Sequence, residues 1–142
     1  MPRWTRTLII AIALAHPLFS AENYIESTAG ATAIALGLME IQPVTGAALK
    51  EDPSQIIKND LEWPGRFRII SAKRVDSLRW VREQAYSYIF GNYWLKGDSI
   101  DLTLGLTDLI SMEPVAGVGG KMRIHKNHLR PALHKFSDQV VK

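Results

Sequence analysis

Three histidines near the C-terminus come closest to the spacing of a metal site. His125 and His128 lie three positions apart, and His134 follows six positions later. A zinc site needs three or four convergent ligands, and the sequence contains no cysteine that could supply one. His125 falls in an expected strand and His128 in the helix cap after it, so the two rings need not converge. We therefore expect structural or surface histidines and no bound metal.

A glycine-rich run, GVGGK at residues 117–121, shares some features with a phosphate-binding loop. A Walker A motif requires glycine five places before Gly120, where Val115 stands, and Ser or Thr after Lys121, where Met122 stands. The pattern fails at both positions. It predicts a flexible connection between strands, and the sequence gives no other indication of a cofactor.

The remaining polar residues do not form a catalytic pattern. Asp98 and Asp101 flank a turn and have no recognisable partner that would raise the pKa of one carboxyl, as a hydrolytic pair requires. No nucleophile elbow surrounds any of the serines at 71, 77, 87, 99 and 111. The aromatic residues lack the interleaved basic residues that single-strand nucleic-acid binders use. We expect a protein that is not an enzyme and that binds no nucleic acid.

A β-hairpin over residues 85–109 is the strongest structural pattern in the chain. Its first arm, residues 86–95, is rich in aromatic and β-branched residues, and Gly97 supplies the conformation that a tight turn needs. Its second arm alternates, with Ile100, Leu102, Leu104 and Leu106 on a core face and Asp101, Thr103, Gly105 and Thr107 facing water. This alternation indicates an antiparallel sheet with one wet face.

Helices and further strands are expected around this hairpin. A helix over 52–61 would be capped by Asp52, and a helix over 76–84 would turn Leu78 and Val81 inward, with Trp80 as a further candidate. A last helix would follow an Asn127 cap and bury an apolar stripe made of Leu129, Ala132, Leu133, Phe136 and Val140. Strands are expected within 23–27, 67–70 and 121–126, with residues 114–120 as a loose connection. Residues 31–41 fit either a helix or a buried strand, and a strand is favoured because Gly30 and Gly37 are poor helix residues. The order predicts an α/β fold (α+β, mixed sheet) of four to five strands with an antiparallel hairpin and helices packed on it.

Residues 1–21 have the features of a signal peptide. Arg3 and Arg6 precede an apolar run at 8–14, and residues 19–21 could precede cleavage. The run is too short to span a bilayer, and Pro17 breaks it, although a retained anchor or an amphipathic helix is the alternative. Removal of two arginines would lower the net charge from +3 to about +1, so the basic pI does not argue for nucleic acid. We expect residues 22–142 to form a single exported domain with no stable membrane span after cleavage.

Three stretches in order resemble the N-terminal domain of the TolB family. They are DLEWPGRFRII at 60–70, the hairpin with YIFGNYW and its Lys-Gly-Asp turn, preceded by Trp80, and LRPALHKFSDQVVK at 129–142. None of the three is specific by itself, but their order adds specificity. The resemblance covers the chain from about Tyr24 to Lys142.

This resemblance implies a periplasmic component of the Tol–Pal system, which keeps the outer membrane intact and helps it constrict at cell division. In that family a β-propeller follows the domain and binds Pal, and the mature N-terminal strand docks on TolA. The present sequence ends where the propeller would begin, so we expect no Pal binding and a stand-alone or truncated form. A TolA-like partner remains an expectation.

The residues expected to contact that partner are Asn23, Tyr24, Ile25, Glu26 and Ser27. An extended segment there could add as a strand to the edge of a partner sheet, although it offers few apolar anchors. The alternative is a tail, or a strand that pairs within the chain's own sheet.

Two other functions stay open from the sequence. One is a periplasmic regulator of a cell-wall enzyme, because lipoprotein activators of peptidoglycan synthases have a similar small mixed α/β architecture. The absence of an N-terminal cysteine for lipid attachment counts against that group. The other is a nonfunctional remnant of a longer protein.

Overall fold

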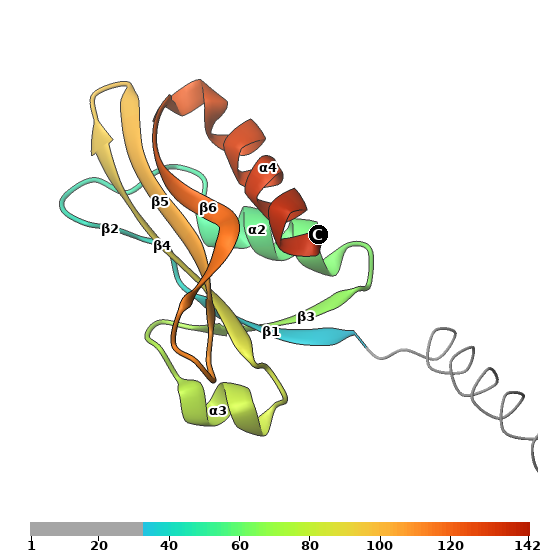
Figure 1. Cartoon of the computed structure of the whole chain (residues 1–142). Coiled ribbons are helices and arrows are strands. Elements are labelled where there is room, and N and C mark those ends of the chain that lie inside the picture. The colour runs from blue at the N-terminus through green and yellow to red at the C-terminus, as the bar shows by residue number, and fades with distance from the viewer. Residues whose placement is uncertain (1–32) are drawn as a thin grey trace, which may run out of the picture. The chain divides into compact units, whose positions relative to one another are not determined.

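A mixed six-stranded sheet organises residues 33–142, which are the residues that the computed structural model describes (Figure 1). The strands lie in the order β3-β1-β4-β5-β6, and β2 pairs with β4 off this path. β1 is parallel to β3 and β4, whereas β4, β5 and β6 are antiparallel. The expected mixed sheet is confirmed, and it has six strands where four to five were expected, the additional one being the two-residue β2. The expected signal peptide at 1–21 and the expected docking residues at 23–27 lie outside the described residues.

Six strands and three helices make up this part of the chain. The strands are β1 Ile34–Met39, β2 Gln42–Pro43, β3 Phe67–Ala72, β4 Ser87–Lys96, β5 Ser99–Asp108 and β6 Pro114–His125. The helices are α2 Pro53–Glu62, α3 Ser77–Arg82 and α4 Leu129–Val141, and a short 3-10 turn, η1 Lys126–His128, precedes α4.

The hairpin of β4 and β5 has the expected register. Lys96 pairs with Ser99 across a turn in which Gly97 has a φ of 58°. Leu102 and Leu104 are almost fully buried, as their alternation predicts. Gly105 and Thr107 are also buried, so the expectation that both face water is wrong. A second layer covers this end of β5, and a side chain at Gly105 would collide with the ring of Phe90.

Helices α2 and α4 cover one face of the sheet, which we call the two-helix face. Its core joins residues of β1, β3, β4 and β5 to the apolar sides of the two helices: Leu36, Leu38, Ile69, Ile89, Ile100, Leu102, Leu104, Ile57, Leu61, Leu133 and Phe136. Partly buried residues of β6 pack against this core: Val118, Met122 and Ile124. Of the expected stripe of the last helix, Leu129, Leu133 and Phe136 are buried, whereas Ala132 and Val140 are only partly buried. This face contains most of the buried apolar surface and therefore most of the hydrophobic stabilisation.

Helix α2 begins where its sequence predicts. The Asp52 side chain accepts a hydrogen bond from the Ser54 N–H at 2.9 Å, and Pro53 occupies the first turn, where no intrahelical donor is needed. The buried Ser54 hydroxyl accepts from the Ile41 N–H at 2.7 Å, which ties the helix start to the end of β1. These bonds fix the chain on both sides of the loop at 44–51.

Helix α3 covers only one end of the opposite face, which we call the one-helix face. Trp80 is fully buried there, stacks on Tyr88 with ring centroids 5.0 Å apart, and donates its indole N–H to the Ile70 carbonyl at 3.0 Å. Leu78 is 81% exposed and Val81 48% exposed, so the expectation that they face inward is wrong. The helix has six residues, too few for a periodic stripe, and one tryptophan anchors it.

The segment expected as a loose connection at 114–120 is part of strand β6. Its glycines allow an irregular pairing with β5: Gly119 has a φ of 74°, and a side chain there would collide with the Leu104 carbonyl oxygen. The expected Asn127 cap is also wrong. Asn127 lies in η1, where its N–H donates to His125 Nδ1 at 3.1 Å, and His128 precedes α4 without a side-chain cap.

Candidate functional site

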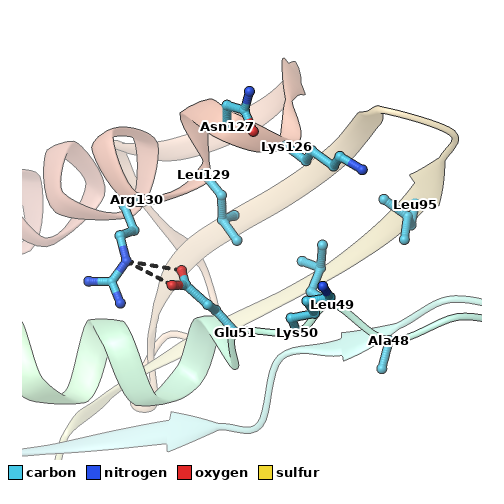
Figure 2. Close-up of a pocket in the computed structure, with 9 residues that line it drawn as sticks. All are labelled: Ala48, Leu49, Lys50, Glu51, Leu95, Lys126, Asn127, Leu129 and Arg130. Carbon is cyan, nitrogen blue, oxygen red and sulfur yellow. Dashed lines mark hydrogen bonds and ion pairs between the residues drawn. The ribbon is translucent and has the colours of Figure 1, made fainter.

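A groove of about 580 Å³ lies between the loop before α2, the end of β4 and the start of α4 (Figure 2). Its lining comes from three separate parts of the chain: Ala48, Leu49, Lys50, Glu51, Leu95, Lys126, Asn127, Leu129 and Arg130. The volume is within the range of about 300–1,000 Å³ that is usual for ligand sites. We call it the basic groove.

Leucine side chains form the floor of the basic groove. Leu129 belongs to the core, and Leu49 and Leu95 pack against that core while remaining partly exposed. Tyr93 holds the loop in place, because its hydroxyl accepts from the Leu49 N–H at 3.0 Å and its carbonyl accepts from the Val44 N–H at 2.8 Å. The floor is therefore apolar and is held on both sides by the fold.

Charged side chains form the rim. Arg130 Nε donates to both carboxylate oxygens of Glu51 at 3.0 Å, and Lys126 Nζ lies 3.0 Å from Asp98 Oδ1. The hydrogen bond from Lys126 lowers the pKa of Asp98. Lys50 makes no ion pair within residues 33–142. The lining thus has three cationic side chains and one anionic side chain.

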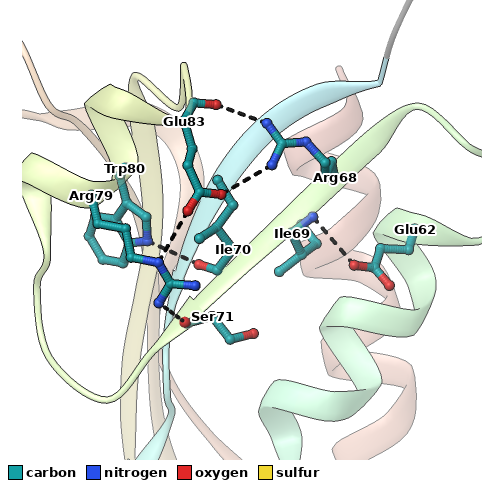
Figure 3. Close-up of polar contacts among 8 residues, drawn as sticks. All are labelled: Glu62, Arg68, Ile69, Ile70, Ser71, Arg79, Trp80 and Glu83. Atoms are coloured by element: carbon teal, nitrogen blue, oxygen red, sulfur yellow. Dashed lines mark hydrogen bonds and ion pairs between the residues drawn. The ribbon is translucent and has the colours of Figure 1, made fainter.

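The free edge of β3 is occupied by side chains (Figure 3). Glu62 accepts from the Ile69 N–H at 3.3 Å, and Arg79 donates to the Ser71 carbonyl at 3.3 Å. Glu83 holds Arg79 and also Arg68, each at 3.2 Å. Because these groups use backbone atoms that an added strand would need, this edge is protected against strand addition.

Large apolar side chains are exposed at the end of the sheet where α3 lies. They come from α3 and the loops on either side of it, and from the turn between β5 and β6: Val75, Leu78, Val81, Tyr86, Ile110 and Met112. The Leu109 N–H donates to the Tyr86 carbonyl at 2.8 Å, which places the turn beside the start of β4. Figure 1 shows the turn and α3 at the same end of the sheet. We call this surface the apolar end.

The three histidines at 125, 128 and 134 lie on the surface and do not form a cluster of ligands. His125 and His128 have ring centroids 6.2 Å apart, although the sequence did not require them to approach each other. His134 Nδ1 lies 2.7 Å from Asp60 Oδ2, in a contact between α4 and α2. No group of three metal-ligating side chains occurs between residue 33 and the C-terminus.

Asp101, one of the two turn carboxylates, is engaged in ion pairs. Arg123 Nε lies 2.7 Å from one of its oxygens and Lys96 Nζ 3.0 Å from the other. Hydrogen bonds from Arg123 and Lys96 lower the pKa of Asp101 to about 2. A carboxylate held ionised in this way cannot act as a general acid near neutral pH.

The sequence did not predict the basic groove. Glu51 and Arg130 are 79 positions apart, and the local patterns around each indicate only a helix start. Lys50 and Leu95 are ordinary loop and strand residues by themselves. The only local indication was that residues 48–52 and 126–130 each lie where a helix begins. The sequence does not indicate that these two segments lie beside each other.

No helix in the described part of the chain is long and apolar enough to cross a membrane. No family model and no curated protein matches the sequence significantly.

Solved structures share the fold. TolB from Acinetobacter baumannii aligns with a TM-score of 0.58 and 16% identity, over 77% of this chain and 27% of TolB. PelC from Paraburkholderia phytofirmans, solved as a dodecamer, aligns with a TM-score of 0.55 and 16% identity, over 78% of this chain and 90% of PelC. The C-terminal domain of LpoB from Salmonella enterica aligns with a TM-score of 0.50 and 14% identity, over 72% of this chain and 91% of that domain. This chain therefore spans about a quarter of TolB, and at these identities the likeness shows a TolB- and LpoB-like mixed α/β fold.

Proposed function

We propose that this protein is an interaction module of the bacterial cell envelope, which binds protein partners and catalyses no reaction. The apolar end carries the proposal, because Leu78 is 81% exposed and Ile110 is 80% exposed at the same end of the sheet. Exposed apolar side chains that gather on one surface mark an interaction site rather than a catalytic cleft. The fold shared with TolB and with an LpoB domain supports an envelope role.

Within this class, a part in the Tol–Pal system is the first candidate. Its support is the ordered sequence resemblance to the TolB N-terminal domain together with the shared fold. After export to the periplasm, residues 23–27 would add as a strand to a TolA-like partner and so contribute to outer-membrane integrity and to constriction at cell division.

Regulation of a cell-wall enzyme is the second candidate. One observation favours it: the alignment covers 91% of the LpoB domain but 27% of TolB. The described part of this chain thus corresponds to almost all of a domain that is solved by itself, whereas in TolB it corresponds to a minor part.

Calorimetric titration separates the candidates. A chain that begins at Glu22 is titrated with the TolA C-terminal domain and, separately, with a peptidoglycan synthase, and a chain that begins at Ala29 serves as comparison. Heat with TolA only, lost in the shorter chain, supports the Tol–Pal role and its docking segment. Heat with the synthase only supports the regulatory role. No heat with either protein overturns the interaction proposal for these partners.

A surface variant tests the observation that carries the proposal. Replacing Leu78→Glu together with Ile110→Glu should weaken partner binding by about tenfold or more, because two unpaired charges would be buried in the interface. Val44→Glu is the matched control, since Val44 is 56% exposed outside the apolar end. Equal affinities for the double variant and the control would remove the apolar end from the interface.

A further inference from the structure

We propose that the basic groove binds an extended acidic peptide in which an apolar side chain stands next to a carboxylate. The inference deepens the proposed function, on which it rests, by assigning a second contact surface and the chemistry of its ligand. It concerns residues 48–51, Leu95 and 126–130, none of which belongs to the apolar end.

The shape and the floor of the groove indicate the apolar part of the ligand. Three leucines, Leu49, Leu95 and Leu129, line one continuous hollow between a loop, a strand end and a helix start (Figure 2). Leu49 and Leu95 remain partly exposed although both pack against the core. An aliphatic side chain placed on this floor would remove their remaining apolar surface from water, which is favourable.

The rim indicates the charged part of the ligand. The contacts of Arg130 with Glu51 use only Nε, and the two Nη nitrogens have no hydrogen-bond partner among the described residues. Figure 2 shows these nitrogens on the side away from Glu51. Lys50 is exposed and has no ion pair in the same part of the chain. An Arg fork at the outer rim and an ammonium without an ion pair suit carboxylates that flank an apolar residue placed on the floor.

The pairing of the other rim charges favours a peptide over a polyanion. Asp98 already neutralises Lys126, and Glu51 partly neutralises Arg130. The groove therefore offers two donors, Lys50 and the Nη nitrogens of Arg130, and not a dense cationic field. Nucleic-acid binding would need several unpaired cations along the path of the phosphates. A short acidic peptide that contributes one or two carboxylates and one aliphatic side chain matches these two donors and the floor. Because the area is small and a peptide must be ordered, the affinity should be micromolar or weaker.

The test is an NMR titration of the ¹⁵N-labelled protein, expressed from its full-length gene. The probe is the peptide acetyl-ELEDLE-amide, and its neutral counterpart is acetyl-QLQNLQ-amide. With the acidic probe, the changes in amide chemical shift should concentrate at residues 48–51 and 126–130. The affinity should fall when the salt concentration is raised from about 0.05 M to about 0.5 M, because salt screens exposed charges. Equal affinity for the neutral probe, or shifts centred elsewhere, would overturn the proposal.

Two pairs of variants test the rim and the hollow separately. Lys50→Glu should lower the affinity for the acidic probe by about tenfold. Lys135→Glu, on the exposed side of α4, should change this affinity by less than about twofold. Ala48→Trp should block the hollow, while Ala47→Trp, an exposed neighbour outside the lining, should not. Equal effects within either pair would overturn the assignment. The synthetic probe needs no cellular partner, so loss of the TolA or synthase interaction leaves this result unaffected.

Discussion

The two faces of the sheet are built in different ways. On the two-helix face, α2 and α4 cover residues from β1 to β6, and the core continues across all five long strands. On the one-helix face, α3 covers one end through a small cluster around Trp80, Tyr88 and Leu109. The first face is buried along its length, whereas the second is buried only where one tryptophan reaches it.

The uncovered part of the one-helix face is polar. Asp101 forms ion pairs there with Arg123 and Lys96, and the Lys96 ammonium lies 4.1 Å from the centre of the Trp94 ring. Exposed pairs of this kind contribute little to stability. This part of the face is exposed to solvent, which is common in antiparallel sheets.

This difference separates the regions that hold the fold from those available for binding. Elements with few buried contacts open more readily than the core, and binding regions are often drawn from them. The apolar end lies on α3 and the turn at 109–113, beside the small cluster. The basic groove lies at the margin of the large core, where Leu49 and Leu95 pack against the core and remain partly exposed.

The largest expected effect tests the two-helix face. Leu104→Asp should lower the free energy of unfolding by about 4 kcal/mol, because an unpaired charge would enter a core in which Leu104 is 2% exposed. Thr103→Asp places the same charge one residue earlier, on the opposite face across from Lys121, and should cost less than about 1 kcal/mol. Urea unfolding measures both. Similar midpoints for the two variants would show that the faces are not distinct at this strand.

Sequence reasoning succeeded where one face is buried along its whole length. The alternation of Ile100, Leu102 and Leu104 gave the correct strand and the correct inner face, because a single core imposes a period of two. The Asp52 cap and the stripe of the last helix were correct for the same reason: local chemistry and the global core agree.

It failed where burial depends on a neighbour distant in sequence. Thr107 is polar and Gly105 has no side chain, so nothing local indicated that a second layer covers them. In α3, the aliphatic Leu78 and Val81 were preferred over Trp80 as core residues. The contacts of Trp80 with Ile70 and Tyr88 instead decide which side of the helix faces the sheet. The basic groove was beyond prediction because it needs three segments to meet.

The anchor of the one-helix face should give an intermediate effect. Trp80→Ala should cost about 3 kcal/mol, since it removes a fully buried ring and leaves a cavity above Gly37. Leu78→Ala, in the same helix, should cost less than about 0.5 kcal/mol, because Leu78 is 81% exposed. Hydrogen exchange should show that Trp80→Ala speeds opening of α3 and the start of β4 more than that of α4. Equal acceleration in all three elements would mean that the two faces unfold as one unit.

The smallest expected effect concerns the polar part of the one-helix face. The folded-state pKa of Asp101 is about 2, below its ordinary value of 3.8, because Arg123 and Lys96 donate hydrogen bonds to the carboxylate. A lowered pKa means that this stabilisation is fully present above pH 3.8 and is lost as the pH falls towards 2.

Asp101→Asn should therefore lower Tm slightly near neutral pH, and the difference from the wild type should shrink as the pH falls through this window. The effect should be small because the ion pairs are exposed. Arg123→Gln should show the same trend, since it removes the principal donor to Asp101. Thermal unfolding followed by circular dichroism at several pH values measures both variants. A Tm difference that is constant from neutral pH to pH 2, or a loss as large as that of Trp80→Ala, would show that this polar part supports the fold more than its exposure indicates.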